Sequence, residues 1–439
     1  MALAVALAAT CAVTLAGITA ATPALAADYE GPRTFQASEV LAPAQIKGPH
    51  FEVAPEVPTE GYLHVFQLRT DFGPLEVEGR SMLVLREHET QALAQLDDVS
   101  KAGVFVKAAG SSLLSTGKGV VSAVRDPEAT AKGIGGGLKR FGTNLGRMAR
   151  RTGDKAVDAV KGDDKKGGDE DARTEKSAGQ KAAAAGEGVA NSVFGVNSAV
   201  RRWAQKVGVD PYTTNPLLKR ALFEIGRVDA GGRLATRVVV PIPTVVSGTA
   251  AVGGLVWGLD PEALMKLNEQ RLREVGASND VIRRLYLSKG FTLSLQTRLA
   301  AALHAVKARG CGEYVDAADE SETERDATFF VESAEMLQAL HAKTRVAAVL
   351  PDSRAMVAKV RDGRAIVLLP VDWVRWTEAF EKSATEVESR ARSELGARKL
   401  ELRTTGRLSP TAKAELARRR WTVVEGLSVT AAATPLPKK

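Results

Sequence analysis

Residues 161–176 divide the sequence, because 11 of these 16 residues are charged and none is a large apolar residue. Such a segment cannot bury enough apolar surface to offset the entropy lost on folding. We therefore predict a charged, disordered linker over residues 152–190, with folded parts on either side. The 439 residues of the chain exceed the usual length of one domain, which agrees with a division into two or three.

The first 26 residues carry no charged side chain and end in the sequence Thr22-Pro23-Ala24-Leu25-Ala26. An apolar stretch that closes on small residues predicts a signal peptide over residues 1–26, cleaved before Ala27. A short membrane anchor is the alternative for the same residues. We expect an exported protein, periplasmic or secreted, that can attach peripherally to a membrane. Cleavage would leave Cys311 as the single cysteine, so no internal disulfide is expected.

The predicted fold class is α+β and mostly helical, with an N-terminal β-hairpin and helix domain. Residues 27–61 contain recurrent prolines without helical or strand periodicity, and they are predicted to form an extended arm. Residues 62–151 are predicted to form an α+β domain that ends in a basic amphipathic helix. The elements expected before that helix are a hairpin of residues 62–68 and 75–78, a third extended run at 81–85 and a helix over 87–99.

Residues 191–344 are predicted to form a central helical domain, with helices that begin at Pro216 and Pro261 because proline is favoured at the first helical position. Residues 345–429 change to short β-prone runs and predict a small C-terminal α/β module, followed by a tail over 430–439. The strands expected in the module are 346–350, 356–360, 365–369, 399–403 and 421–425, and its helices are 372–395 and 409–419.

Two tryptophans stand at the predicted start of the helix over 372–395. Trp373 and Trp376 would share one face of that helix, and Asp372 would cap it. The pair forms either a binding patch or part of the core of the small sheet.

One segment carries a marked local excess of positive charge. The net charge is +8, and residues 118–151 alone contain eight basic and two acidic residues. Five apolar residues in this segment recur at helical spacing and form one stripe: Ile134, Leu138, Phe141, Leu145 and Met148. The opposite face would carry Lys139, Arg140, Arg147, Arg150 and Arg151. Such a helix can bind an anionic membrane interface, or it can pack its stripe on the neighbouring domain and leave its charges in solvent.

Residues 238–259 carry no charge and are long enough to cross a bilayer. Pro241, Pro243 and four glycines interrupt them as a helix. A buried core helix, a reversibly inserting segment and a true membrane span are the three interpretations.

Catalytic chemistry has weak sequence support. Cys311 lies between two glycines, and His341 and Asp352 follow it, so a Cys-His-Asp arrangement built on the weak candidates Cys311 and His341 is one hypothesis. The five histidines lack the spacing of zinc ligands, and the glycines of residues 133–137 lack the spacing of nucleotide-binding loops. We therefore predict no cofactor and no metal site.

Composition narrows the function classes further. Aromatic residues make up only 5% of the chain, which disfavours an aromatic platform for sugars or nucleobases, and we expect no nucleic-acid partner. The sequence favours a non-catalytic interaction or scaffold protein that contacts an anionic membrane surface or an envelope protein partner. The alternatives are an envelope cysteine hydrolase that uses Cys311, and a secreted effector that inserts residues 238–259 into a membrane.

Overall fold

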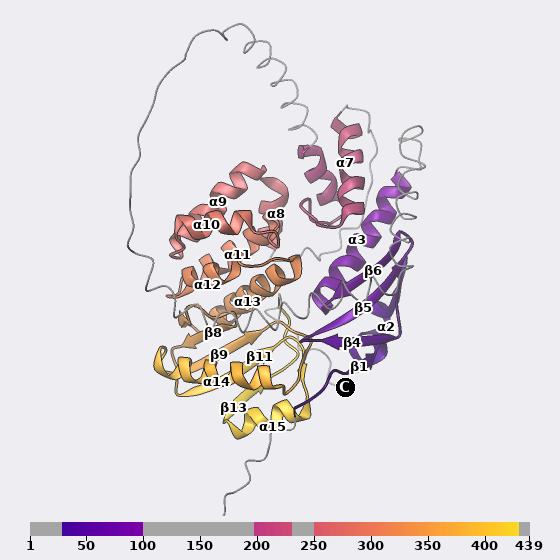
Figure 1. The fold of residues 1–439 in the computed structure, drawn as a ribbon. Helices are drawn as coiled ribbons and strands as arrows, with labels where there is room; N and C mark the ends of the chain where they lie inside the picture. Colours follow the sequence, from indigo (N-terminus) through magenta and orange to yellow (C-terminus); the bar gives the residue numbers. More distant parts are fainter. Residues whose placement is uncertain (1–28, 100–196, 231–249, 430–439) are drawn as a thin grey trace, which may run out of the picture.

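The computed structural model describes residues 29–99, 197–230 and 250–429, and it shows a mixed α+β fold (Figure 1). An N-terminal sheet packs beside the long helix α3 (Arg80–Val99), a group of helices follows, and a second sheet lies in the C-terminal part. These parts meet around α3 and α13 (Glu324–Lys343), and their junction positions the site described below.

The N-terminal sheet is antiparallel and is centred on β5 (Leu63–Thr70). β6 (Gly73–Glu78) pairs with β5 as the predicted hairpin, with Leu68 opposite Leu75. The other side of β5 pairs with β4 (Glu56–Glu60) near its beginning and with β3 (Phe51–Val53) near its end. The outer strands are β1 (Thr34–Gln36) and β2 (Lys47–Gly48), and the short helices are α1 (Ala37–Val40) and α2 (Pro43–Ile46).

Residues 34–60, which were expected to belong to a separate extended arm, supply β1 to β4 and are part of this sheet. The prolines mark its turns and helix starts, since Pro43 is the first residue of α2 and Pro55 lies between β3 and β4. Strands of two to five residues are too short to show a clear two-residue period, and this explains why the sequence pattern concealed them.

Helix α3 begins earlier than its sequence indicates. The extended run expected at residues 81–85 is wrong, because these residues form the first turns of α3, whereas the helix expected over 87–99 is confirmed. Gly79, with a φ of +91°, turns the chain at the end of β6. The carboxylate of Asp372 then accepts the backbone N–H of Arg80 at 3.2 Å and that of His64 at 3.0 Å. A residue 292 positions away in the sequence therefore caps α3.

The helical segment confirms the helix starts at Pro216 and Pro261. Residues 197–206 are also helical. Side-chain oxygens of Asp260, Ser278, Thr292 and Thr323 cap four of the helices. The helices before α13 are α7 (Pro216–Ala230), α8 (Ala250–Gly258), α9 (Pro261–Glu274), α10 (Asn279–Leu287), α11 (Leu293–Val306) and α12 (Cys311–Ala318).

The C-terminal sheet has the strand order β13-β11-β9-β8-β7 and confirms the five predicted strands. β7, β8 and β9 are antiparallel, whereas β9, β11 and β13 are parallel. The strands are β7 (Val346–Val349), β8 (Met356–Val360), β9 (Arg364–Leu369), β11 (Lys399–Thr404) and β13 (Trp421–Val424). Its helices are α14 (Glu378–Ser393) and α15 (Pro410–Arg418), and the short strands β10 (Trp373–Val374) and β12 (Arg407–Leu408) form a separate pair.

Alternate residues of the C-terminal sheet enter different cores. Ile366 and Leu368 belong to the apolar cluster that contains α11 and α13, whereas Val367 belongs to the cluster that contains α14 and α15. The N-terminal residues attach to the same module, because the carboxylate of Glu30 accepts the backbone N–H of Trp376 at 2.7 Å and the hydroxyl of Ser409 at 2.5 Å.

The two tryptophans do not start a helix. Trp373 lies in β10 and meets the ring of Phe35 at a centroid distance of 5.1 Å, so it packs on the N-terminal sheet. Trp376 is fully buried in the cluster around α14, which confirms the core interpretation for this residue. The capping role expected of Asp372 at this helix is wrong, because Thr377 caps α14 and Asp372 caps α3.

Candidate functional site

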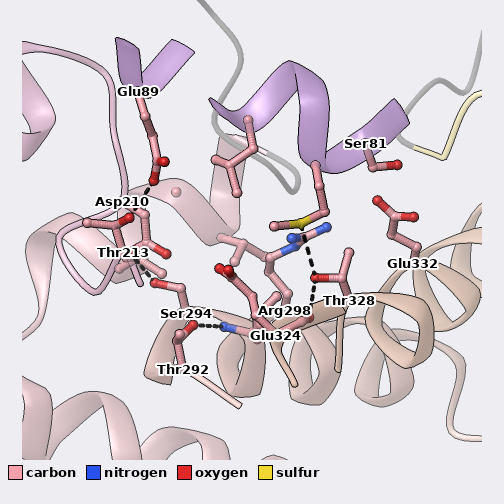
Figure 2. A pocket seen from close by; sticks show the side chains of 16 residues that line it. Ser81, Glu89, Asp210, Thr213, Thr292, Ser294, Arg298, Glu324, Thr328 and Glu332 are labelled. Carbon is pink, nitrogen blue, oxygen red and sulfur yellow. Dashed lines mark hydrogen bonds between the residues drawn. The ribbon is translucent and has the colours of Figure 1, made fainter. Parts of the chain in front are cut away.

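A small cleft lies where α3 meets α8, α11 and α13, and Figure 2 shows its side chains. Its cavity volume is about 50 Å³, which is room for a few water molecules. Five charged side chains from four parts of the chain line it: Glu89 of α3, Asp210 from the segment before α7, Arg298 of α11, and Glu324 and Glu332 of α13.

Arg86 of α3 connects two carboxylates at the edge of this cleft. Its guanidinium donates to Glu89 at 2.6 Å and to Glu324 of α13 at 2.6 Å. Glu89 is 1% exposed and also accepts the Thr213 hydroxyl and the side-chain amide of Asn215, the latter at 3.0 Å. Burial lowers the pKa of Arg86, but Glu89 and Glu324 more than offset this and raise it. The network therefore joins α3 to α13 and to the start of α7.

A second ion pair lies deeper in the cleft wall. Arg298 of α11 donates from Nε and Nη2 to the two carboxylate oxygens of Glu335 on α13, at 2.8 Å each. The side chains are 7% and 8% exposed, so the pair is nearly removed from water. Burial lowers the pKa of Arg298, but Glu335, Glu332 and Asp210 together raise it above its ordinary value. This two-point contact fixes α11 against α13.

Two further carboxyl groups face Arg298 without a two-point partner of their own. Burial raises the pKa of Glu332 to about 7, and Arg298 and Ser81 lower it only in part. Burial also raises the pKa of Asp210 to about 6, although Asp210 accepts the Ser294 hydroxyl at 2.6 Å and the Tyr212 N–H at 2.8 Å. As the pH falls, both groups are protonated near neutral pH, well above the pH at which ordinary carboxyl groups are protonated.

The arrangement of the cleft is suited to proton uptake that is coupled to helix packing. Its cavity holds water-sized molecules, and its carboxyl groups lie between α3 and the helices that α3 packs against. Within residues 29–99, 197–230 and 250–429, no group of three or more His, Cys, Asp or Glu side chains has the arrangement of a metal site.

The substitution Glu332→Gln is expected to remove part of the pH dependence of stability. Because the pKa of Glu332 is raised to about 7 in the folded protein, the folded state binds this proton more tightly than the unfolded chain, and stability falls as the pH rises from about 4.5 to about 7. Glutamine cannot ionise, so the variant should gain up to about 3 kcal/mol relative to the parent between pH 4 and pH 8. Urea unfolding at several pH values measures this difference.

The matched control is Glu313→Gln, on the exposed side of α12. It should leave the pH profile of unfolding unchanged. Parallel profiles for the parent protein and Glu332→Gln would contradict the assignment of a near-neutral proton to Glu332.

Cys311 begins α12 and is completely buried. Burial raises the pKa of its thiol to about 11, so the thiol is protonated at neutral pH. His341 accepts the backbone N–H of Val346 at 3.4 Å, and His304 pairs with Glu274 at 2.8 Å. No hydrogen bond between described residues joins the Cys311 side chain to a histidine. The geometry therefore gives the cysteine hydrolase hypothesis no support.

Several predicted segments lie outside the described residues. These are the signal peptide, the charged linker, and the basic helix with Lys139, Arg140, Arg147, Arg150 and Arg151. The uncharged stretch at 238–259 is described only from residue 250, where α8 begins, and Val252 and Val256 of α8 are buried in a small apolar cluster. Among the residues that the structure describes, no helix has both the length and the apolar character needed to cross a bilayer.

None of the cleft residues had been predicted from the sequence as part of a site. One signal was available for α11 and α13, because Arg298 is the only Lys or Arg of α11, and Glu332 and Glu335 are the only acidic residues from position 327 to 343. Isolated charges on apolar helices predict buried ion pairs. No such signal existed for Asp210, which lies in a short turn.

Comparison with known proteins gives no further assignment: no family model matches the chain, and no curated protein or solved structure matches it.

Proposed function

We propose that this protein is an exported, non-catalytic interaction or scaffold protein whose segment 134–151 binds an anionic membrane surface. In this proposal residues 1–26 are a signal peptide and residues 152–190 are a linker. The N-terminal α+β domain, the helical domain and the C-terminal module form the body that carries the binding segment.

The observation that carries the proposal is the contact between the described helices on either side of residues 100–196. Leu96 and Val99, at the end of α3, share an apolar cluster with Trp203 and Ala204 of the following helix. Leu218 and Leu222 of α7 complete this cluster, and α7 lies beside α3 in Figure 1. The described residues that precede and follow residues 100–196 therefore meet in one apolar cluster.

The cleft network supports the same proposal, because it makes α3 part of a connected frame. Arg86 joins α3 to Glu324 of α13, and Glu89 joins α3 to Asn215 at the start of α7. Helix α3, which ends just before residues 100–196, is thus held by polar contacts to α13 and to the start of α7, and by the apolar cluster to the helix over 197–206. A folded body with these contacts can carry the proposed membrane-binding segment and needs no catalytic site for this role.

The test is the triple variant Arg147→Glu, Arg150→Glu and Arg151→Glu in the full chain. Each basic residue near an anionic surface contributes roughly a fivefold increase in binding, so reversal of three charges should lower partitioning onto anionic vesicles by at least about 100-fold. Cosedimentation with phosphatidylglycerol vesicles at 0.1 M salt measures this change.

The control variant, Lys219→Glu, Lys266→Glu and Lys289→Glu, changes the net charge equally, at exposed positions on the helical segment. It should bind almost as the parent does. Unchanged binding of the Arg147, Arg150 and Arg151 variant would contradict the proposal.

A further inference from the structure

Four strands of the C-terminal sheet begin at the same end of the sheet. β7, β9, β11 and β13 run in the same direction, because β7 and β9 are both antiparallel to β8 and β11 and β13 are parallel to β9. The register places Val346 opposite Val360, Lys399 opposite Arg364 and Leu400 opposite Trp421. The residues that precede these strands, and those that follow β8, therefore share one edge.

Six exposed cations lie at this edge, and we name them the basic rim. They stand just before β7, just after β8, and at or before the starts of β11 and β13. The members of the basic rim are Lys343, Arg345, Arg361, Arg398, Lys399 and Arg420.

The carboxylates near the basic rim are already paired with other arginines. Asp362 pairs with Arg364 at 2.7 Å, Glu394 with Arg390 at 2.7 Å, and Glu401 with both Arg364 and Arg403. Among the residues that the structure describes, no carboxylate forms an ion pair with any of the six rim cations. Their charge is thus not neutralised by the described part of the body.

Backbone contacts fix the turns that carry the basic rim. The ammonium group of Lys359 donates to the carbonyl of Gly363 at 3.2 Å and to that of Gly396 at 2.7 Å. The N–H of Arg398 donates to the carbonyl of Gly363 at 3.0 Å. Neighbouring strands are spaced by about 4.8 Å, so five strands hold the rim cations in a band about 20 Å wide.

The surroundings of the band favour an extended anionic surface as its partner. The rim contains no aromatic residue, and the adjacent Trp421 is 6% exposed, so the rim offers no stacking platform for nucleobases. None of the rim residues lines the cleft between α3, α8, α11 and α13. A band of cations on rigid turns can contact many phosphate headgroups at once. We propose that the basic rim is a second contact surface for anionic phospholipid membranes.

This inference rests on the proposed function for the choice of a membrane, but it uses residues that the segment 134–151 does not contain. The test is the triple variant Arg361→Gln, Arg398→Gln and Arg420→Gln in the full chain. The loss of three surface cations, at roughly fivefold each, should weaken binding to phosphatidylglycerol vesicles by about 100-fold. The matched control, Lys219→Gln, Lys266→Gln and Lys289→Gln, removes the same charge from exposed positions of the helical segment.

Circular dichroism and the thermal midpoint verify that the rim variant is folded. Weaker vesicle binding by the rim variant than by its control supports the inference, whatever the Arg147, Arg150 and Arg151 variant does. Parental binding by the folded rim variant, or equal losses in the rim variant and its control, overturns it and leaves the proposed function to be judged by its own variant. Binding to soluble polyphosphate but not to vesicles would also overturn the choice of a membrane.

Discussion

Replacement of Arg298 by methionine is expected to lower the free energy of unfolding by about 3–5 kcal/mol at pH 7.5. Methionine fills a similar volume but leaves Glu335, which is 8% exposed, without its two-point partner. Glu332 lies one turn away on α13 and would lose the same cation. An unpaired buried carboxylate costs its full desolvation free energy, so the loss should exceed that of an ordinary surface substitution. Urea unfolding measures it directly.

The control for this experiment is Arg273→Met on α9, whose partner Glu269 is 38% exposed. An exposed pair of this kind contributes within about 0.5 kcal/mol. The double variant Arg298→Met and Glu335→Met should recover most of the stability, because it removes both charges together. A loss below about 1 kcal/mol for Arg298→Met alone would show that the ion pair does not hold α11 against α13.

The C-terminal sheet was predictable because its signals are local. Its strands alternate with turns such as Asp362-Gly363, where Gly363 has a φ of +93° and the Asp362 side chain accepts the N–H of Arg364. Helix α15 begins with Ser409 as its cap and Pro410 as its first residue, a signal that needs only two positions. Contacts between residues that are close in the sequence determine these elements, so the sequence pattern was sufficient to predict them.

Elements that depend on distant residues were not predictable. The start of α3 depends on Asp372, and the hydrogen bond of Glu30 to Ser409 joins residues 379 positions apart. From the local sequence, Asp372 was a reasonable cap for the helix predicted over 372–395. In the folded protein its carboxylate caps the distant helix α3 instead. The residues of the cleft converge only after folding, so their common location could not be read from spacing.

The basic rim shows why counting charged residues along the sequence finds some charged surfaces and misses others. The segment 118–151 stands out because its eight basic residues accompany only two acidic residues and an apolar stripe at helical spacing. The six rim cations are spread over residues 343–420, among 12 other basic and 10 acidic residues, so the sequence alone does not single them out. The fold separates the two sets, because Glu401 forms an ion pair with Arg364, whereas the strand register leaves Lys399 and Arg420 at the edge.

The substitution Gly310→Ala is expected to lower the free energy of unfolding by about 3–4 kcal/mol. Gly310 precedes α12 with a φ of +91°, and an added Cβ would lie 2.1 Å from the carbonyl oxygen of Val349. The backbone of β7 would have to move away, although the N–H of Val349 donates to the carbonyl of Arg309 at 2.7 Å. That contact joins the helical segment to the edge of the C-terminal sheet, so its loss should separate the two.

Gly396→Ala is the control that isolates the packing effect. Gly396 also has a positive φ, +59°, but nothing lies within 4 Å of the position of an added Cβ. Only the conformational cost of about 1 kcal/mol should remain there. Urea unfolding of both variants measures the difference, and equal losses would mean that the close approach of Gly310 to β7 does not limit stability. A larger loss at Gly310 would show that the helices and the C-terminal sheet are held at a fixed backbone distance, which is what a rigid support for the basic rim requires.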